Sequence, residues 1–360
     1  MPYKAILVGA GGQGRAWCAR FLPPNVADGL VEVVAAVDIN PEALKNAQEH
    51  LALPAEKCYT DQQRAFDENP ADFAIIVTPP AWHEPVVDLA LAHDLHILSE
   101  KPIADTLEGA VRIAEKVKRR GKKMGVTMSH RFDQDKTTLR QELRAKHNGA
   151  LDYLVCRFTC NMRNFGDWGA PFRHTMQDPL MIEGAVHHLD ILADLAGAKC
   201  EQLYAQSWNP AWGSYGGDSQ ALVTMRFENG VHALYEGAKT NAVGLNGWTQ
   251  EYVRAECEAA TLIMDHRRVE RFRYAGGRIY QQEGEGEIIA LIDQPKWANT
   301  WLVELFVRWL DGGEPMATNV ADNLQSMALV FAAIESSRTG QPVQVQEFLQ
   351  RTYQLETEKL

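Results

Sequence analysis

Two clusters of titratable side chains have the composition of acid–base sites. In the first, Glu100 and Lys101 precede a proline, and a lysine beside an acid can hold a substrate hydroxyl and favour loss of its proton. In the second, Glu183, His187 and Asp190 are spaced by four and then three residues. On an α-helix this spacing puts all three on one face. A histidine flanked by carboxylates can then act as a general base or acid near neutral pH.

Each cluster also has a simpler interpretation. Glu100 and Lys101 fit a solvated ion pair before a helix, and residues 183–190 fit a polar helix face packed on another part of the protein. His188 points about 100° away from His187 on a helix and is the poorer candidate. A zinc site at Glu183 and His187 lacks a third ligand at diagnostic spacing, so we expect no metal.

A glycine-rich segment near the start of the chain indicates a dinucleotide site. It follows the apolar run 3–8 and matches the pattern G-x-G-x-x-G, whose glycines permit a tight turn, close approach of a pyrophosphate and packing of helix on strand. The N–H groups at the helix start then face the phosphates. The apolar run 31–37 ends in Asp38, near the expected position of the acid that binds the adenosine ribose. An ordinary glycine-rich loop with a surface aspartate is the alternative. The residues predicted to bind the cofactor here are Gly9, Gly11, Gly12, Gln13, Gly14 and Asp38.

Two further segments follow apolar runs that read as strands. Thr78-Pro79-Pro80-Ala81-Trp82-His83 follows the run 73–77, and Glu100-Lys101-Pro102 follows the run 96–99. In open parallel sheets the ligand lies beyond the carboxyl ends of the strands. A proline-stiffened loop without a ligand explains the first segment equally well. We expect cofactor contacts from Thr78, Pro79, His83, Glu100 and Lys101.

Apolar runs alternate with helical patterns over the first third of the chain. Such alternation predicts a parallel sheet covered on both faces, which makes residues 1–128 a Rossmann-type dinucleotide-binding domain. The predicted strands are 5–8, 31–37, 73–77, 96–99 and 124–127, and the predicted helices are 15–22, 42–51, 85–93 and 107–120.

Beyond residue 128 the pattern changes to longer strands with partial alternation. They are predicted at 151–159, 201–207, 219–227, 232–236 and 251–256, with helices at 297–310 and 319–336. Glu228-Asn229-Gly230 is a hairpin signal, so residues 129–360 read as an α/β domain with a mostly antiparallel sheet. The irregular stretch 161–180 has the length of a functional loop.

Bulk composition fits two globular domains. The chain has 360 residues, of which 46% are hydrophobic and 23% charged, and this length is enough for two cores. A net charge of −11 argues against nucleic acid and anionic membranes as partners. Six scattered cysteines fit reduced thiols. With no apolar run of membrane-spanning length and no room for a signal peptide before the first strand, we expect a cytoplasmic protein.

Taken in order, these motifs resemble those of the glucose–fructose oxidoreductase, inositol dehydrogenase and rhizopine-catabolism (Gfo/Idh/MocA) family. The resemblance includes the glycine loop, Asp38, the Thr78–His83 segment, Glu100-Lys101-Pro102, and a carboxylate four residues before His187 with Asp190 three after it. The stretches 332–336 and 339–343 resemble the family's usual ending, so the resemblance runs over nearly the whole chain.

The resemblance implies an N-terminal Rossmann domain and a C-terminal α/β domain that binds substrate and whose large open sheet often forms oligomer interfaces. It implies a homodimer or homotetramer that transfers hydride between NAD(P) and a hydroxyl or keto carbon of a sugar, cyclitol or related polyol. NAD is expected over NADP because the Asp38 carboxylate repels a 2′-phosphate.

The resemblance extends to individual residues of the expected active site. Lys101 and His187 match the family's catalytic lysine and histidine, and Glu183 stands where the family usually has aspartate, as a further candidate catalytic carboxylate. Rough alignment places Arg131 and Asn161 where some relatives contact substrate. The expected substrate-binding residues are Lys101, Arg131, Asn161, Trp168, Arg173 and His187.

Two other functions remain open. An NAD-retaining lyase or glycoside-cleaving enzyme would act on a sugar through transient oxidation, with Glu183 as a second acid or base. A non-catalytic NAD-binding sensor is the other, and the presence of Lys101 and His187 argues against it. The substrate itself stays unnamed, because the loops 161–180 and 208–218 carry no diagnostic motif.

Overall fold

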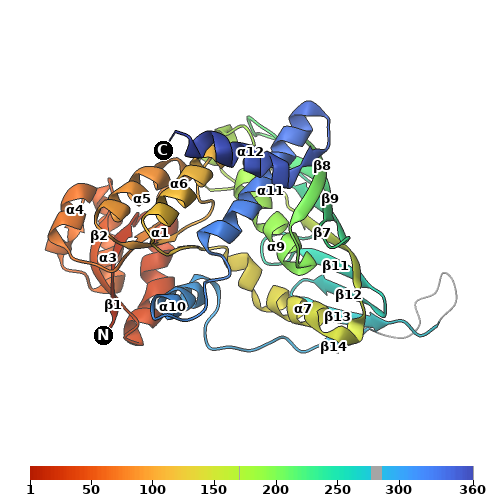
Figure 1. Cartoon of the computed structure of the whole chain (residues 1–360), viewed down its shortest axis with the longest axis horizontal. Helices are drawn as coiled ribbons and strands as arrows, with labels where there is room; N and C mark the ends of the chain where they lie inside the picture. The colour runs from red at the N-terminus through yellow and green to blue at the C-terminus, as the bar shows by residue number, and fades with distance from the viewer. Residues whose placement is uncertain (170, 277–285, 360) are drawn as a thin grey trace. The chain divides into compact units, whose positions relative to one another are not determined.

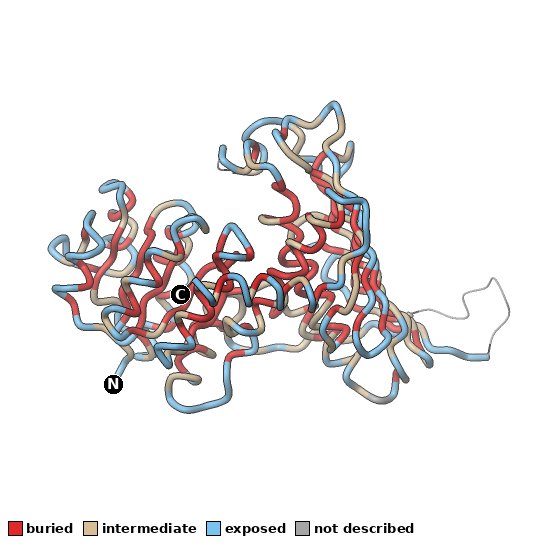
Figure 2. The backbone as a smooth tube through the Cα atoms, turned by 45° about the horizontal axis from the view of Figure 1, so that its top comes forward, coloured by how far each residue is buried: buried red, intermediate tan, exposed pale blue. Residues whose placement is uncertain are grey.

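The computed structural model describes residues 1–169, 171–276 and 286–359. These residues form two compact units, each with its own sheet (Figure 1). The first unit comprises residues 1–129, 295–324 and 352–360, and the second comprises residues 130–294 and 325–351. Buried segments follow the strands within each unit (Figure 2). Over the described ranges, no helix is both long enough and apolar enough to cross a bilayer.

The described strands of the first unit form a fully parallel sheet of six. They are β1 (Tyr3–Val8), β2 (Val31–Val37), β3 (Cys58–Tyr59), β4 (Phe73–Ile76), β5 (His96–Ser99) and β6 (Met124–Val126). Their order is β3-β2-β1-β4-β5-β6, which is the Rossmann order. Strands are added on one side of β1 up to β3 and then on its other side from β4 onward, so the strand order reverses between β1 and β4. The predicted parallel sheet is confirmed, and the ligand edge is the one where β1 and β4 end.

The helices of the first unit begin at recognisable signals. Asn40 caps α3 through its side chain, with Pro41 at the first helical position, and Thr106 caps α6 in the same way. The helical segments contributed largely by this unit are α1 (Gln13–Ala16), the π-helical turn η1 (Trp17–Phe21), α2 (Leu22–Ala27), α3 (Pro41–Leu51), α4 (Gln62–Glu68), α5 (His83–Ala92), α6 (Leu107–Arg119) and α10 (Ala298–Leu310).

Residues from the end of the chain complete this unit. Next to β6, Val126 N–H donates to the Thr318 carbonyl over 2.8 Å, and the Thr318 hydroxyl donates to the Val126 carbonyl over 2.7 Å. On α6, Arg112 pairs with Glu356 at 2.8 Å. Glu356 belongs to α12 (Val345–Thr357). The first unit therefore combines residues from the start of the sequence with residues from its last part.

The second unit contains a mixed sheet of nine described strands. They are β7 (Leu151–Thr159), β8 (Cys200–Trp208), β9 (Gln220–Phe227), β10 (His232–Ala238), β11 (Tyr252–Cys257), β12 (Ala260–Asp265), β13 (Arg268–Arg273), β14 (Glu287–Ile289) and β15 (Val343–Gln344). The order is β14-β13-β12-β11-β7-β10-β9-β8-β15. Only β7 and β10 pair in parallel among the described neighbours. The predicted hairpin joins β9 and β10, with Gly230 at φ 86°.

One face of this sheet is covered and the other is open. The helices α7 (Gln134–Arg144), α9 (Val186–Ala196) and α11 (Val320–Thr339) lie along one face in Figure 1. Along β9, buried and exposed residues alternate strictly. On the uncovered side, Leu222 and Leu234 are 44% and 39% exposed among polar neighbours such as Thr224 and Glu236, whereas the solvated face of an antiparallel sheet is usually polar throughout.

We predict that the chain self-associates through this open face, because contiguous exposed apolar residues usually mark an interaction site. Sedimentation at micromolar concentration is expected to give at least twice the mass of one chain. Leu222→Glu combined with Leu234→Glu should shift the species toward the monomer. Ile39→Glu, at an exposed apolar residue of the first unit, is the matched control and should leave the mass unchanged. A monomer mass for the unmodified chain contradicts the prediction.

Candidate active site

The glycine loop that follows β1 has a backbone that tolerates no side chain at two positions. Gly9 has φ +100°, and a Cβ there would lie 2.8 Å from the carbonyl carbon and oxygen of Val77. A Cβ on Gly14 would lie 2.3 Å from the Gly9 carbonyl oxygen. The first glycine thus allows the turn against the end of β4, and the last allows the helix to pack on the loop. This is the cradle that a pyrophosphate requires.

Asp38, at the end of β2, is joined to this loop. Its Oδ2 accepts from the N–H groups of Ala10 at 2.8 Å and Gly11 at 3.0 Å, and its Oδ1 accepts from Asn40 N–H at 2.8 Å. A carboxylate has about four acceptor positions, so it keeps capacity for a ribose hydroxyl. The residues present therefore fit an adenosine ribose and pyrophosphate.

We predict a preference for NAD over NADP of at least about tenfold in kcat/KM, since a carboxylate facing a 2′-phosphate costs several kcal/mol. Ile39 and Asn40 follow Asp38 and supply no guanidinium for that phosphate. Asp38→Ser and Asp38→Asn should both narrow the preference, because both remove the charge. Asn retains an acceptor oxygen and should keep more NAD activity than Ser. Efficiency with NADP equal to that with NAD in the unmodified enzyme contradicts this role of Asp38.

His83 lies beneath the loops that follow β4 and β5. It is fully buried, with Nε2 2.7 Å from the Thr78 carbonyl oxygen and Nδ1 3.1 Å from that of Ile103. Burial lowers the pKa of His83, against the opposing effect of these carbonyl groups. The geometry gives His83 a bracing role between the two loops, and its contact with the cofactor stays a prediction. Thr78 Oγ1 is buried without a hydrogen-bond partner in the described part of the chain, and its contact with the cofactor likewise stays a prediction.

Glu100 points into the first unit. Its Oε1 accepts from Trp17 Nε1 at 2.8 Å and from Asn299 Nδ2 at 2.9 Å, and its Oε2 accepts from the Lys101 N–H at 3.2 Å. Glu100 is only 8% exposed. Its carboxylate therefore anchors the turn that carries Lys101, rather than forming the solvated pair that the sequence also allowed.

In the second unit, Arg131 and Asp190 form a buried pair. Arg131 Nε donates to Asp190 Oδ2 at 2.9 Å, and its Nη2 donates to Oδ1, which also accepts from the Ser326 hydroxyl. Asp190 is fully buried. This bidentate pairing ties the start of the unit to α9 and α11. Contact of Arg131 with a substrate stays a prediction.

Glu183 precedes α9 and has a basic partner of its own. It lies in the π-helical turn η6 (Met181–Ala185), so the regular α-helical spacing to His187 that the sequence analysis assumed does not apply through this turn. Arg173 Nε donates to Glu183 Oε2 at 3.0 Å. The guanidinium of Arg173 also lies 5.6 Å from the centre of the Trp168 ring.

Two predicted substrate residues, Trp168 and Arg173, therefore belong to one group of contacts with Glu183, the predicted catalytic carboxylate. The Lys239 ammonium, which follows β10, packs on the same Trp168 ring and lies 6.0 Å from the ring centre of Trp248. Asn161 forms an isolated β-bridge with Thr240, the residue after Lys239. The Asn161 Oδ1 accepts a hydrogen bond from Arg163 Nε at 3.1 Å.

His187 also contacts Trp248. Its ring is stacked on that of His130, with centres 4.2 Å apart and planes 19° apart, and meets the Trp248 ring edge-on at 5.9 Å. His188 instead packs against Phe158, 4.6 Å between ring centres, and is fully buried. His188 also stacks on Trp248, with ring centres 5.6 Å apart, so both histidines contact the same indole, and the choice of His187 over His188 stays a prediction.

Four residues near these side chains were not predicted as site residues: His130, Lys239, Trp248, and Glu251, whose Oε1 lies 3.7 Å from His130 Nδ1. His130 immediately precedes Arg131. Lys239 directly follows β10, but the strand was predicted only as far as residue 236, so strand-end position was a weak signal for the lysine. Trp248 lies in an irregular loop without a recognised motif. Nothing in local spacing connects these residues to His187.

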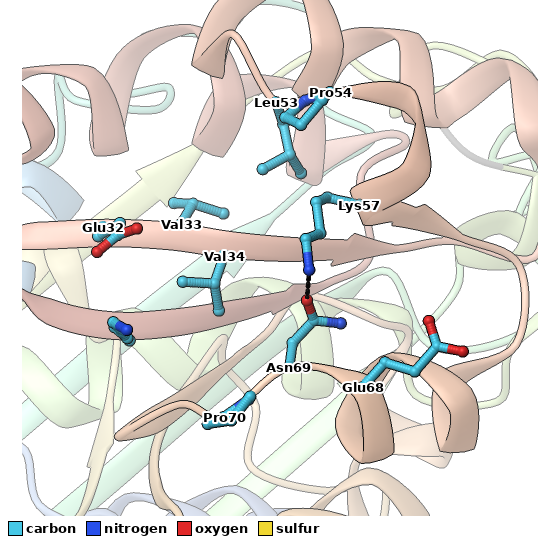
Figure 3. Close-up of a pocket in the computed structure, with 10 residues that line it drawn as sticks. Glu32, Val33, Val34, Leu53, Pro54, Lys57, Glu68, Asn69 and Pro70 are labelled. Carbon is cyan, nitrogen blue, oxygen red and sulfur yellow. Dashed lines mark hydrogen bonds between the residues drawn. The ribbon is translucent and has the colours of Figure 1, made fainter.

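Within the described ranges, no group of three or more His, Cys, Asp or Glu side chains has the arrangement of a metal site. A surface hollow of about 340 Å³ includes Lys4, Val33 and Lys57, and Lys57 Nζ donates to Asn69 Oδ1 at 2.6 Å (Figure 3). It lies toward the starts of β1 and β2, whereas the glycine loop follows the end of β1.

Comparison with known families matches both parts of the chain. A model of the Gfo/Idh/MocA oxidoreductases described as the NAD-binding Rossmann fold matches residues 3–128. A second model, described as the C-terminal alpha/beta domain of the same oxidoreductase family, matches residues 154–345.

Individual relatives agree with this match. The chain is 56% identical over 352 residues to the uncharacterized protein y4oX of Sinorhizobium fredii, covering 97% of this chain and 98% of the relative. It is 26% identical over 314 residues to the scyllo-inositol 2-dehydrogenase (NAD(+)) of Bacillus subtilis, covering 84% and 87%. A solved oxidoreductase from Agrobacterium radiobacter in complex with NAD+, L-tartaric acid and magnesium shares the fold, with a TM-score of 0.80, 19% identity and coverage of 96% and 99%. Together with the geometry of the glycine loop, these matches show that the chain is an NAD-binding oxidoreductase of the Gfo/Idh/MocA family.

Proposed function

We propose that the protein is an NAD-dependent dehydrogenase of a sugar, cyclitol or related polyol, acting as a cytoplasmic homo-oligomer in carbohydrate metabolism. The observation that carries the proposal is the presence of Lys101 after β5 and His187 on α9 in a chain with a complete dinucleotide loop. The relative named as a scyllo-inositol 2-dehydrogenase (NAD(+)) supports a polyol as the substrate class.

In this proposal Lys101 and His187 take different parts in the reaction. The Lys101 ammonium holds the hydroxyl oxygen and stabilises the negative charge that develops there. His187 Nε2 or Nδ1 takes the hydroxyl proton as general base. When bound, NAD supplies the acceptor for the hydride that leaves the substrate carbon. Because Glu100 holds the Lys101 backbone, the ammonium needs little reorganisation to meet the substrate.

The remaining predicted residues serve recognition. Trp168 offers an apolar ring to the C–H face of a sugar or cyclitol, and Asn161 offers an amide to its hydroxyls. Arg173 is paired with Glu183, so we propose that this pair binds neighbouring hydroxyls as a unit. Glu183 then contributes binding and orientation, with a direct catalytic part reserved for Lys101 and His187.

The test is oxidation of a panel of sugars, cyclitols and polyols with NAD by the purified full chain. Formation of NADH in equal amount to oxidised substrate supports the dehydrogenase. Turnover without net reduction, with cofactor that co-purifies, instead supports the NAD-retaining lyase or glycoside-cleaving alternative. Binding of NAD with no turnover on any member contradicts both.

A further inference from the structure

A buried carboxylate–lysine pair lies under the histidines of the second unit. Glu251, directly before β11, and Lys136, on α7, are each 1% exposed, and Lys136 Nζ donates to Glu251 Oε2 over 2.7 Å. The backbone N–H of Thr249 donates to Oε1 at 3.1 Å. Two donors on different elements thus hold the carboxylate, at the desolvation cost that any buried ion pair carries.

The Lys136 ammonium is shared among three carboxylates. Lys136 Nζ also lies 3.3 Å from Asp133 Oδ2 and 3.5 Å from Asp135 Oδ2. Burial alone would raise the pKa of Glu251, but the nearby His130 and His188 rings and the Lys136 charge hold that pKa well below its ordinary range. The same carboxylates raise the pKa of Lys136 against the effect of burial.

Glu251 Oε1 also faces two histidines, at ion-pair distance. It lies 3.7 Å from His130 Nδ1 and 3.6 Å from His188 Nε2, both beyond hydrogen-bond length, and these two buried ring nitrogens have no hydrogen-bond partner within the described residues. His188 is held on its other side, with Nδ1 3.0 Å from the Tyr235 hydroxyl oxygen. Burial lowers the pKa of His188 to about 4, so its ring is neutral at physiological pH.

His130 connects the carboxylate to His187. One of its ring nitrogens faces Glu251, and one of its ring faces is stacked on His187. The Trp248 ring meets both imidazoles edge-on, 5.3 Å from His130 and 5.9 Å from His187, at interplanar angles of 88° and 85°. The indole therefore packs against the edge of the imidazole pair. Within the pair, the His187 ring lies nearly parallel to the His130 ring.

We propose that Glu251 and His130 are positioning residues for His187: the buried carboxylate holds the His130 ring, and that ring holds the imidazole of His187 in the plane from which it accepts the substrate proton. This inference rests on the proposed function, in which His187 is the general base. Neither residue belongs to the motifs that the sequence analysis identified, and the proton-transfer steps above make no use of them.

The physical reason is that a general base works only from a defined direction. An imidazole on a single Cβ rotates about two torsions, and each misdirected rotamer removes the ring nitrogen from reach of the hydroxyl. A misplacement of about 1 Å costs on the order of 10²-fold in rate. A ring stacked flat on a second ring, itself held by a fixed carboxylate, loses most of that freedom before substrate binds.

The first test needs no substrate. The full chain is labelled with ¹⁵N in its histidine rings, and the His187 signals are assigned by their loss in His187→Gln. In His130→Ala we expect the His187 ring signals to move and to broaden as the two tautomers and several rotamers exchange. In His130→Phe, which keeps a flat ring, they should stay close to the wild-type positions. Unchanged His187 signals in His130→Ala overturn the proposal.

The second test is kinetic, on the best substrate of the panel. His130→Ala should lower kcat by about tenfold to hundredfold with little change in KM, and His130→Phe should recover most of that loss. Glu251→Gln should lower kcat in the same direction. Tyr235→Phe is the matched control, because it removes a partner of His188 in the same cluster and leaves His130 and His187 in contact. A Tyr235→Phe loss as large as that of His130→Ala shows general packing and overturns the proposal.

The two tests separate failure of this inference from failure of the proposed function. If no compound of the panel is oxidised, the proposed function fails, while the ring signals still decide whether His130 sets His187. If the panel yields a substrate and His130→Ala has wild-type kcat, the inference fails and the function stands. His130 has a side chain 19% exposed, so its variants should fold, and thermal unfolding of each variant verifies this.

Discussion

Lys101→Ala is expected to lower kcat by about 10²–10³-fold while NAD still binds. The loss has the size found when one preorganised group that stabilises developing charge is removed. NAD binding should persist because the glycine loop and Asp38 are held by contacts that do not include the Lys101 side chain: the Gly9–Val77 approach and the Asp38 hydrogen bonds. Calorimetric titration with NAD and steady-state kinetics measure the two quantities on the same preparation.

Two variants make the Lys101 result specific. Lys118→Ala removes a lysine whose side chain is 75% exposed on α6, and it should leave kcat unchanged. Lys101→Arg keeps the charge but presents a planar, less compact group, so it should recover part of the activity at most. Full activity of Lys101→Ala would show that residues 100–102 have a structural role only.

His187→Ala is expected to lower kcat by about 10²–10⁴-fold, the range that a general base contributes. His188→Ala should act mainly on stability. It empties a fully buried site and takes a partner from Tyr235, which by analogy with large-to-small core substitutions costs about 2–4 kcal/mol in the free energy of unfolding. Kinetics below the unfolding transition and denaturant titrations therefore separate the two neighbours.

The pH dependence sharpens the contrast between the two histidines. Because burial lowers the pKa of His188 to about 4, its ring does not ionise near neutral pH and cannot account for an ionisation there. The pH–rate profile of the unmodified enzyme should show an ionisation that His187→Ala abolishes and that stabilised preparations of His188→Ala retain. Equal losses of kcat in both variants would remove His187 from the catalytic assignment.

For strands that contain an apolar run, the first and last residues could be predicted from the sequence to within a residue or two. The runs 31–37, 96–99 and 151–159 coincide with β2, β5 and β7, since buried strands are read directly from their side chains. The strand β13 was missed because Arg268–Arg273 contains three arginines and a glutamate, whereas β12 was missed although it contains the apolar run 262–264, a run too short to distinguish strand from helix. β3 has two residues and no pattern to detect.

The residues of the candidate site also separate into those that could be predicted from the sequence and those that could not. The glycine loop, Asp38 and Lys101 could be placed because each follows a strand of the parallel sheet, where topology alone determines the edge. The arrangement around His187 could not, because Trp248 and Glu251 reach it through tertiary packing. The π-helical turn Met181–Ala185 also changes the phase of Glu183 relative to α9, and an insertion of that kind has no signature in hydrophobic periodicity.

The late segments that complete the first unit have a consequence for synthesis. While the ribosome has made only residues 1–129, β6 is an edge strand without Thr318, and Arg112 on α6 has no Glu356 to pair with. Domains generally fold as they emerge, N-terminal part first, yet these contacts of β6 and α6 join residues 192 and 244 positions apart. They can form only after that much more of the chain has been translated, and a chain truncated before Glu356 lacks the pairing with Arg112.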